Sequence, residues 1–290
     1  MLDIVIAQVI NGLVLGFLYV VIALGLSIIF GMIGIVNFAH GVFFALGAYF
    51  ALMLRPYVGD AGILIVAPIL AGLAGMLIEA TLLRPIQGED PLLGLLLTFG
   101  LALFVQALIQ TIWGNLGYPF NVPDFFLGFV AYGPIFVTRY RLAVLGITVL
   151  ILLIVWLFLE KTPWGRVVRA GSRDAEMVDM LGINLRTVFT FTFGLGTTLA
   201  GIAGVLAAPL WSVQPAMADL AIMPAFVVVT IGGLGSFMGS VIAGLLVGVS
   251  IALTIQFWPA AATSVMYVLM AFVLLVRPRG LFGERWERFE

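Results

Sequence analysis

The sequence predicts an all-α, polytopic membrane protein of eight or nine spans, with the whole chain, 1–290, forming one transmembrane domain. Of the 290 residues, 63% are hydrophobic and only 9% are charged, whereas a soluble domain carries roughly a quarter charged residues. Uncharged stretches recur along the chain, most of them about as long as a helix needs to cross a bilayer. The chain has no cysteine, which excludes disulfides and thiolate metal sites.

The first apolar stretch, 4–36, lacks a basic N-terminal region and is too long for a signal peptide. As one straight helix it would reach about 50 Å, against a hydrocarbon core of roughly 30 Å, so it must tilt, break or turn. The glycines and Asn37 of GMIGIVNFAHG favour a break there. The later stretches lie at 38–54, 61–83, 92–113, 142–159, 188–211, 220–234, 240–257 and 260–276.

Basic residues predict the orientation of the spans. With loop 161–186 in the cytoplasm, a nine-span count leaves the N-terminus outside and a cytoplasmic tail at 277–290. Ten basic residues then lie inside and three outside. The ten are Arg84, Lys161, Arg166, Arg169, Arg173, Arg186, Arg277, Arg279, Arg285 and Arg288, and the three are Arg55, Arg139 and Arg141. Residues 114–140 have the composition of an interfacial surface loop.

Motifs of common enzyme classes are missing. A single histidine excludes the HExxH zinc site, and no GxSxG turn occurs. The glycine-rich run 231–244 lacks the lysine of a phosphate-binding loop, so it predicts tight packing and a short turn between helices. Small-xxx-small spacing predicts further close helix contacts at Gly12/Gly16, Gly235/Gly239 and Gly244/Gly248.

Glu79 is the one acidic residue inside a predicted span, and it lies near the end of that span with Arg84 close by. We expect its side chain to reach the lipid headgroups. Ion-coupled carriers place carboxylates within their spans. The sequence therefore predicts that energy for any transport comes from elsewhere.

Asn37, His40 and Gly41 are candidate residues of a translocation path. They follow the predicted helix break, and broken helices in transporters lie beside the solute, where protein or water satisfies the exposed backbone. A histidine in an apolar stretch is more often a packing residue, so that alternative stays open. Gln106 and Gln110 share a helix face, which we expect to point toward a neighbouring helix.

Loop 161–186 predicts a short amphipathic helix with Ser172 as its N-cap and Gly182 as its end. Its acidic first turns disfavour binding to anionic headgroups and favour docking into a groove on a soluble partner. The acidic and apolar positions of this helix are Asp174, Glu176, Met177, Met180 and Leu181.

Four segments together resemble one transporter family. They are GLSIIFGMIGIVNFAHGVFFALGAY, RAGSRDAEMVDMLGIN, IGGLGSFMGSVIAGLLVG and RPRGLFG. They are similar to the permease subunits of binding-protein-dependent ABC importers for branched-chain amino acids, specifically the H-type subunit. The similarity covers the chain except for 113–141. Val178 stands where the family often has alanine. Ser250 stands where the family commonly has glutamate, and this difference leaves open which amino acid is the substrate.

The resemblance implies a type II importer-like fold in the inner (cytoplasmic) membrane. It implies a second, M-type permease, two cytoplasmic ATPases that hold ATP and Mg²⁺, and an extracytoplasmic solute-binding protein. The chain itself would be a transport subunit with no catalytic activity and no cofactor. A permease for urea or short amides and a stand-alone channel remain alternatives. The residues expected to relay ATPase closure are Ser172, Arg173, Asp174, Glu176, Met177, Met180, Leu181, Gly182 and Ile183.

Overall fold

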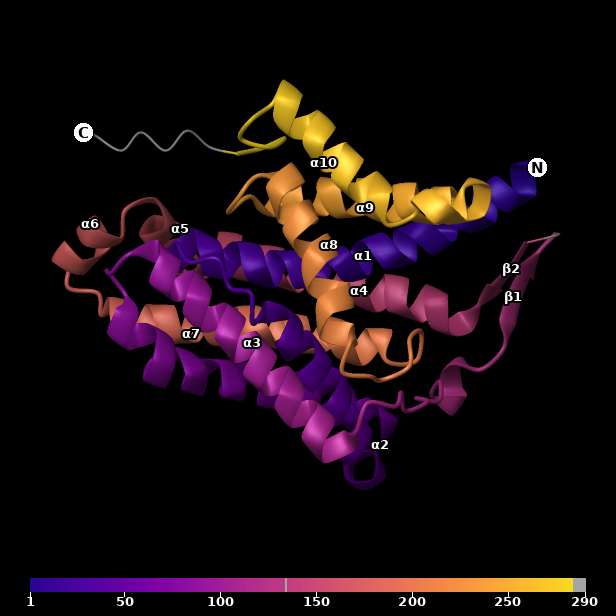
Figure 1. Cartoon of the computed structure of the whole chain (residues 1–290), viewed down its shortest axis with the longest axis horizontal. Coiled ribbons are helices and arrows are strands. Elements are labelled where there is room, and N and C mark those ends of the chain that lie inside the picture. Colours follow the sequence, from indigo (N-terminus) through magenta and orange to yellow (C-terminus); the bar gives the residue numbers. More distant parts are fainter. Residues whose placement is uncertain (134, 284–290) are drawn as a thin grey trace.

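The computed structural model describes residues 1–133 and 135–283 and consists mainly of helices (Figure 1). The longest are α1 (Leu2–Ile33), α2 (His40–Ile78), α3 (Pro91–Trp113), α4 (Arg139–Lys161), α7 (Leu185–Ala207) and α9 (Phe237–Phe257). The shorter α-helices are α5 (Pro163–Arg173), α6 (Ala175–Met180), α8 (Met217–Gly232) and α10 (Ser264–Val276). Single helical turns are η1 (Glu79–Leu83), η2 (Arg84–Ile86), η3 (Asp124–Phe126) and η4 (Pro259–Ala261).

Six helices of the described chain are long and apolar enough to cross a membrane. They are α1, α2 with its continuation to Ile86, α3, α4, α7 and α9, and α8 and α10 are shorter apolar helices. Their bounds follow the predicted apolar stretches within a few residues. The polytopic helical membrane class is therefore confirmed, whereas the count of eight or nine crossings stays a prediction.

Helix α2 contains two of the predicted apolar stretches and folds back at Gly59, whose φ of +69° and ψ of 179° break the helix. A Cβ on Gly47 would lie 2.5 Å from the Cα of Gly201, and a Cβ on Gly201 would lie 2.8 Å from the Cβ of Ala71. A straight helix would separate residues 47 and 71 by about 36 Å. Both arms of α2 therefore pack against the same part of α7.

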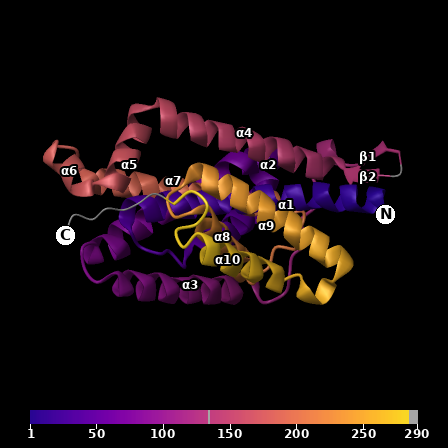
Figure 2. The ribbon, with the colours of Figure 1, turned by 90° about the horizontal axis from the view of Figure 1, so that it is seen from above.

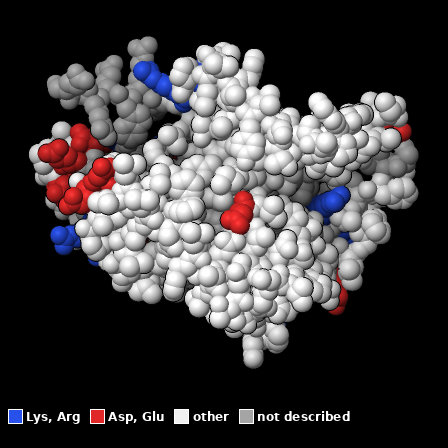
Figure 3. Space-filling model, viewed as in Figure 1, with Lys and Arg blue, Asp and Glu red and all other residues white. Residues whose placement is uncertain are grey.

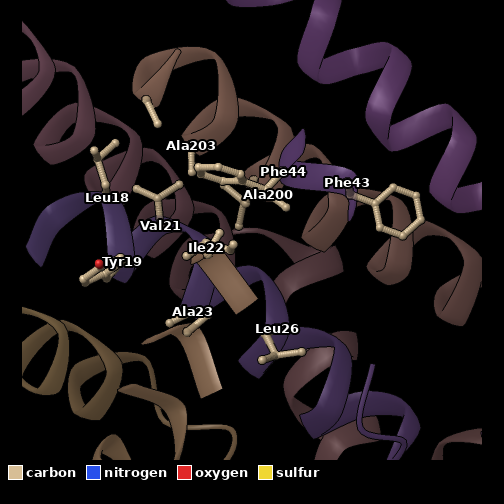
Figure 4. Packing of buried hydrophobic residues seen from close by; sticks show 14 of the residues in the cluster. Leu18, Tyr19, Val21, Ile22, Ala23, Leu26, Phe43, Phe44, Ala200 and Ala203 are labelled. Carbon is tan, nitrogen blue, oxygen red and sulfur yellow. The ribbon is translucent and has the colours of Figure 1, made fainter. Parts of the chain in front are cut away.

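The core lies where α1, α2 and α7 meet. Figure 4 shows Ile22 of α1, Phe44 of α2 and Ala200 of α7 grouped together, and all three are buried. Helix α9 packs closely on α1, because a Cβ on Gly248 would lie only 2.3 Å from the Cα of Gly16. This confirms the predicted small-residue contact. Helices α3 and α4 lie on opposite flanks of this core (Figure 2).

The predicted surface loop 114–140 contains a short hairpin. Strands β1 (Phe129–Tyr132) and β2 (Ile135–Thr138) form an antiparallel hairpin in which Val130 faces Val137. Aromatic and β-branched residues favour extended backbone, and Gly133 supplies the positive φ of the turn, +59°. The hairpin therefore adds local structure to the loop that connects α3 and α4 and leaves the helical class unchanged.

The predicted cytoplasmic elements gather at one end of the molecule, opposite the N-terminus and the hairpin (Figure 1). There the backbone N–H of Leu281 donates to the carbonyl of Ile231, and a Cβ on Gly31 would contact both Gly235 and Ser172. The glycine-rich run 231–244 forms the predicted turn between α8 and α9. Arg285 and Arg288 of the predicted tail lie outside the described residues.

Candidate functional site

The loop between α4 and α7 is a compact pair of helices. Thr162 ends α4 and caps α5, because its hydroxyl accepts from the backbone N–H of Gly165 at 3.0 Å. A Cβ on Gly165 would lie 2.3 Å from the carbonyl of Phe158, so only glycine permits this tight turn. At the other end of α5, Gly171 leaves space for the side chain of Met32 from α1. Helix α5 therefore packs against α1 of the helical core.

Helix α6 forms within the predicted segment but begins differently. Ser172 lies in the last turn of α5, where its hydroxyl donates to the carbonyl of Arg169. Asp174 is the N-cap instead, and its carboxylate accepts from the backbone N–H of Met177 at 2.8 Å. The expectation for Ser172 was wrong because α5 extends one residue past it. Gly182, with φ +81°, ends the segment as predicted, and Asn184 caps α7.

The predicted apolar stripe of α6 faces outward. The side chains of Met177, Met180 and Leu181 are 51%, 70% and 73% exposed. Val178 alone anchors the helix, at 3% exposure. Three large apolar side chains in water are expensive unless something covers them. Charged side chains gather at the left end of the molecule in Figure 3, whereas most of the remaining surface in this view is uncharged. Helix α6 therefore carries an exposed apolar stripe, and its role in docking stays a prediction.

Glu79 does not reach the headgroups as expected. Its side chain is fully buried in the π-turn η1. The hydroxyl of Thr190 in α7 donates to Oε2 at 2.6 Å, and the amide of Gln87 donates to Oε1 at 3.0 Å. Arg84 completes an ion pair at 3.3 Å. The inserted residue of a π-turn re-aims side chains within a helix, and this one turns the carboxylate toward α7.

The predicted break after α1 is present at Gly34, whose φ is +74°. Residues 34–39 run back beside the core, because α2 begins next to Ile22 in the middle of α1. Thr98 of α3 holds this segment, accepting from the N–H of Phe38 and donating to the carbonyl of Val36. Asn37 is buried, and its amide has no partner among the described residues. We call residues 34–39 the broken segment.

His40 and Gly41 begin α2 within the interior of this chain. His40 is buried, and its Nε2 lies 3.0 Å from the carbonyl of Ile22. A Cβ on Gly41 would lie 2.4 Å from the carbonyl of Ala218 in α8. The structure therefore brings Asn37, His40 and Gly41 together beside the first turn of α8. Their role in a translocation path stays a prediction.

A polar pair that the sequence did not reveal lies beside this junction. The side-chain amide of Gln106 in α3 donates to Oδ2 of Asp219 at 2.8 Å. Gln106 therefore faces a neighbouring helix, as expected, whereas Gln110 is exposed. Asp219 escaped notice because the predicted span began at residue 220, and α8 begins three residues earlier. Pro215 just before the helix was a usable start signal.

A pocket of about 400 Å³ is lined in part by Leu220, the residue that follows Asp219 in the sequence. It combines polar groups with apolar and aromatic surface, the mixture typical of small-molecule sites. Helix α1, the loop before α8 and α8 itself contribute its walls. The lining residues are Tyr19, Trp211, Ser212, Gln214 and Leu220.

Comparisons with known proteins agree with this architecture. The family described as branched-chain amino acid transport system / permease component matches residues 8–276. The chain is 31% identical to the high-affinity branched-chain amino acid transport system permease protein LivH of Escherichia coli (strain K12), over 95% of this chain and 94% of that protein. Identity to the corresponding permease protein BraD of Pseudomonas aeruginosa is 30%, over 95% of each chain.

Two further matches are more distant. The permease protein LivM of Escherichia coli (strain K12) is 29% identical over 91% of this chain and 67% of LivM. Among solved structures, PsaBC from Streptococcus pneumoniae in complex with Fab gives a TM-score of 0.49 at 14% identity, over 96% of this chain and 92% of that chain. The family match covers most of the sequence, and LivH and BraD are matched over nearly their full lengths. The chain therefore belongs to the branched-chain amino acid transport system permease family.

Proposed function

We propose that this chain is the H-type permease of an ATP-driven, binding-protein-dependent importer for branched-chain or other hydrophobic amino acids. The observation that carries the proposal is the family match over residues 8–276. LivH is matched over 94% of its length and LivM over 67%, which supports the H-type assignment. The chain itself binds no nucleotide in this scheme and serves as the membrane path.

Its partners in this proposal are a second, M-type permease, two cytoplasmic ATPases and an extracytoplasmic binding protein. ATP and Mg²⁺ belong to the ATPases. The exposed stripe of Met177, Met180 and Leu181 supports docking of α6 into an ATPase groove, because an amphipathic helix binds a groove through its apolar face. Buried Val178 anchors α6 on the permease, so in this proposal movement of the ATPase is passed to α5 and α7.

The broken segment supports alternating access at the level of the core. Thr98 binds the backbone of Val36 and Phe38, and the side-chain amide of Asn37 between them has no partner among the described residues. Irregular backbone within a membrane domain is where transporters bind solute. Asn37, His40 and Gly41 are accordingly proposed to border the path, in an importer of the bacterial inner membrane.

Reconstitution tests this function directly. The full complex in proteoliposomes, with binding protein outside and ATP inside, is expected to accumulate leucine only when ATP is hydrolysed. Liposomes that hold this chain alone are expected to show no leucine flux. ATP-independent flux by the lone chain would establish the channel alternative, and accumulation of urea or short amides in place of leucine would establish a different substrate class.

A further inference from the structure

We propose that Asp219, held by Gln106, contacts the ammonium group of the amino-acid solute as it passes the open face of α8. This inference rests on the proposed function and adds a residue to it. Asp219 is exposed in the first turn of α8, and Gln106 occupies its Oδ2 atom. Asp219 is the one acidic residue of 217–232.

The position of Gln106 along α3 indicates how deep its partner Asp219 lies in the membrane domain. Gln106 lies seven residues before Trp113, the end of α3, which is about 10 Å at 1.5 Å per residue. The exposed neighbours Phe104 and Leu108 on α3 are apolar, as lipid-facing residues are. A carboxylate at this depth is costly against lipid and normally faces a polar path or a partner charge. Asp219 therefore needs a cation or water.

Within residues 1–133 and 135–283, Asp219 forms no ion pair with a basic side chain. Ion pairs within this part of the chain include those of Arg55 with Asp60, Arg84 with Glu79 and Arg169 with Glu160. The sequence contains no lysine or arginine in 187–276 or in 85–138. The α-ammonium of an amino acid is a cation that the proposed function itself supplies.

The adjacent pocket suits the rest of such a solute. Leu220 follows Asp219 directly and lines the pocket, together with Trp211. These side chains offer apolar surface to a branched aliphatic chain, and Ser212 and Gln214 offer hydrogen bonds. In this proposal the ammonium group of the solute contacts Asp219 while its hydrophobic side chain occupies the pocket. Neutral amides lack this charge, so the site favours amino acids over them.

Transport by the complete reconstituted importer tests the role of Asp219. Asp219→Asn keeps the shape and removes the charge, and we expect leucine uptake to fall at least tenfold, equivalent to about 1.4 kcal/mol. Binding-protein-stimulated ATPase activity and co-purification with the second permease should persist. Asp3→Asn, in the exposed first turn of α1, is the matched control. Wild-type uptake by Asp219→Asn would overturn the proposal, as would loss of co-purification, which would assign Asp219 to subunit pairing.

A second readout does not depend on turnover. In the complex, Ser212→Cys gives this permease one thiol, since it has no native cysteine. Millimolar leucine is expected to slow labelling of that thiol by a water-soluble maleimide, and 4-methylpentanoate, which lacks the ammonium, is not. Adding Asp219→Asn should abolish protection by leucine. Equal protection by both compounds would refute the contact with ammonium. Failure of the wild-type complex to import leucine would instead reject the proposed function.

Discussion

The hydroxyl of Thr190 donates a 2.6 Å hydrogen bond to the buried carboxylate of Glu79, although 111 positions separate the two residues. This bond joins the π-turn after α2 to the second turn of α7. Asn184, the N-cap of α7, comes six residues before Thr190, and α6 ends at Met180, four residues before that cap. The bond therefore ties the first turns of α7 to the π-turn η1. That α7 passes movement of α6 to the core stays a prediction.

Removing the Glu79 carboxylate should destabilise the permease. Glu79→Ala leaves Arg84 and Thr190 without their buried partner, and breaking a buried ion pair costs about 3 kcal/mol. Thermal unfolding of the purified protein in detergent measures the effect. Glu160→Ala is the control, because its pair with Arg169 is well exposed and should change stability by less than about 1 kcal/mol. Equal losses in the two variants would contradict the buried network.

Close packing of α1 on α9 predicts a position-specific effect of one methyl group. A Cβ on Gly248 would overlap the backbone of Gly16, so Gly248→Ala should destabilise the fold by about 2 kcal/mol. Gly146 on α4 has open space around it, and Gly146→Ala should be neutral or stabilising by up to about 1 kcal/mol. Unfolding midpoints of the two variants test this. If Gly248→Ala proves as stable as Gly146→Ala, the helix contact is wrong.

The broken segment should depend on a single hydroxyl. Thr98→Val removes the bonds to Val36 and Phe38 and leaves these backbone groups without that partner, at a cost of about 1–3 kcal/mol. We expect lower stability and slower leucine uptake. Thr148→Val is the control, because the Thr148 hydroxyl only returns to carbonyls of its own helix. Normal uptake with Thr98→Val would show that transport does not require this anchor.

A change at the end of α6 should uncouple the ATPases. Gly182 has φ +81°, which proline cannot adopt, so Gly182→Pro should misplace Met180 and Leu181. Binding-protein-stimulated ATPase activity is expected to disappear while membrane insertion persists. Gly114→Pro imposes the same kind of strain at the opposite end, where φ is +79°, and should retain stimulation. Full stimulation with Gly182→Pro would remove α6 from the coupling path.

A charge reversal on α6 should have the same effect without backbone strain. Glu176 is exposed on this helix, so Glu176→Lys leaves the fold intact and changes only the surface that a partner meets. The expected result is loss of stimulated ATPase activity with unchanged thermal unfolding. Stimulated ATPase activity at the wild-type level would show that the partner does not contact this face of α6.

Sequence reasoning located the spans because hydropathy marks which residues lie in lipid. The same pattern does not show which face of a uniformly apolar helix is buried. The inward turn of Glu79 depends on the π-turn and on Thr190, which belongs to a distant helix. The scarcity of carboxylates within the predicted spans is therefore weak evidence against ion coupling, because Glu79 is buried and Asp219 lies on α8. Family membership supports the function better.

The site was predicted in part for similar reasons. The sequence predicted Gly182 as a helix end and Gly16 as a close helix contact, because the backbone at such positions favours glycine. The N-cap moved from Ser172 to Asp174 because the extent of α5 depends on packing against Met32 of α1. The pairing of Gln106 with Asp219 joins residues 113 positions apart, and only the fold brings them together.

The most direct test of the account asks what touches α6. Because the chain has no cysteine, Met180→Cys places a single thiol on the exposed stripe, and a photoreactive crosslinker attached there reports its neighbour in native membranes. Met53→Cys, on an exposed apolar face of α2, is the lipid-facing control. We predict that the label at residue 180 forms an adduct with the ATPase subunit and that the label at residue 53 reaches phospholipid. Adducts with phospholipid alone at residue 180 would contradict the account.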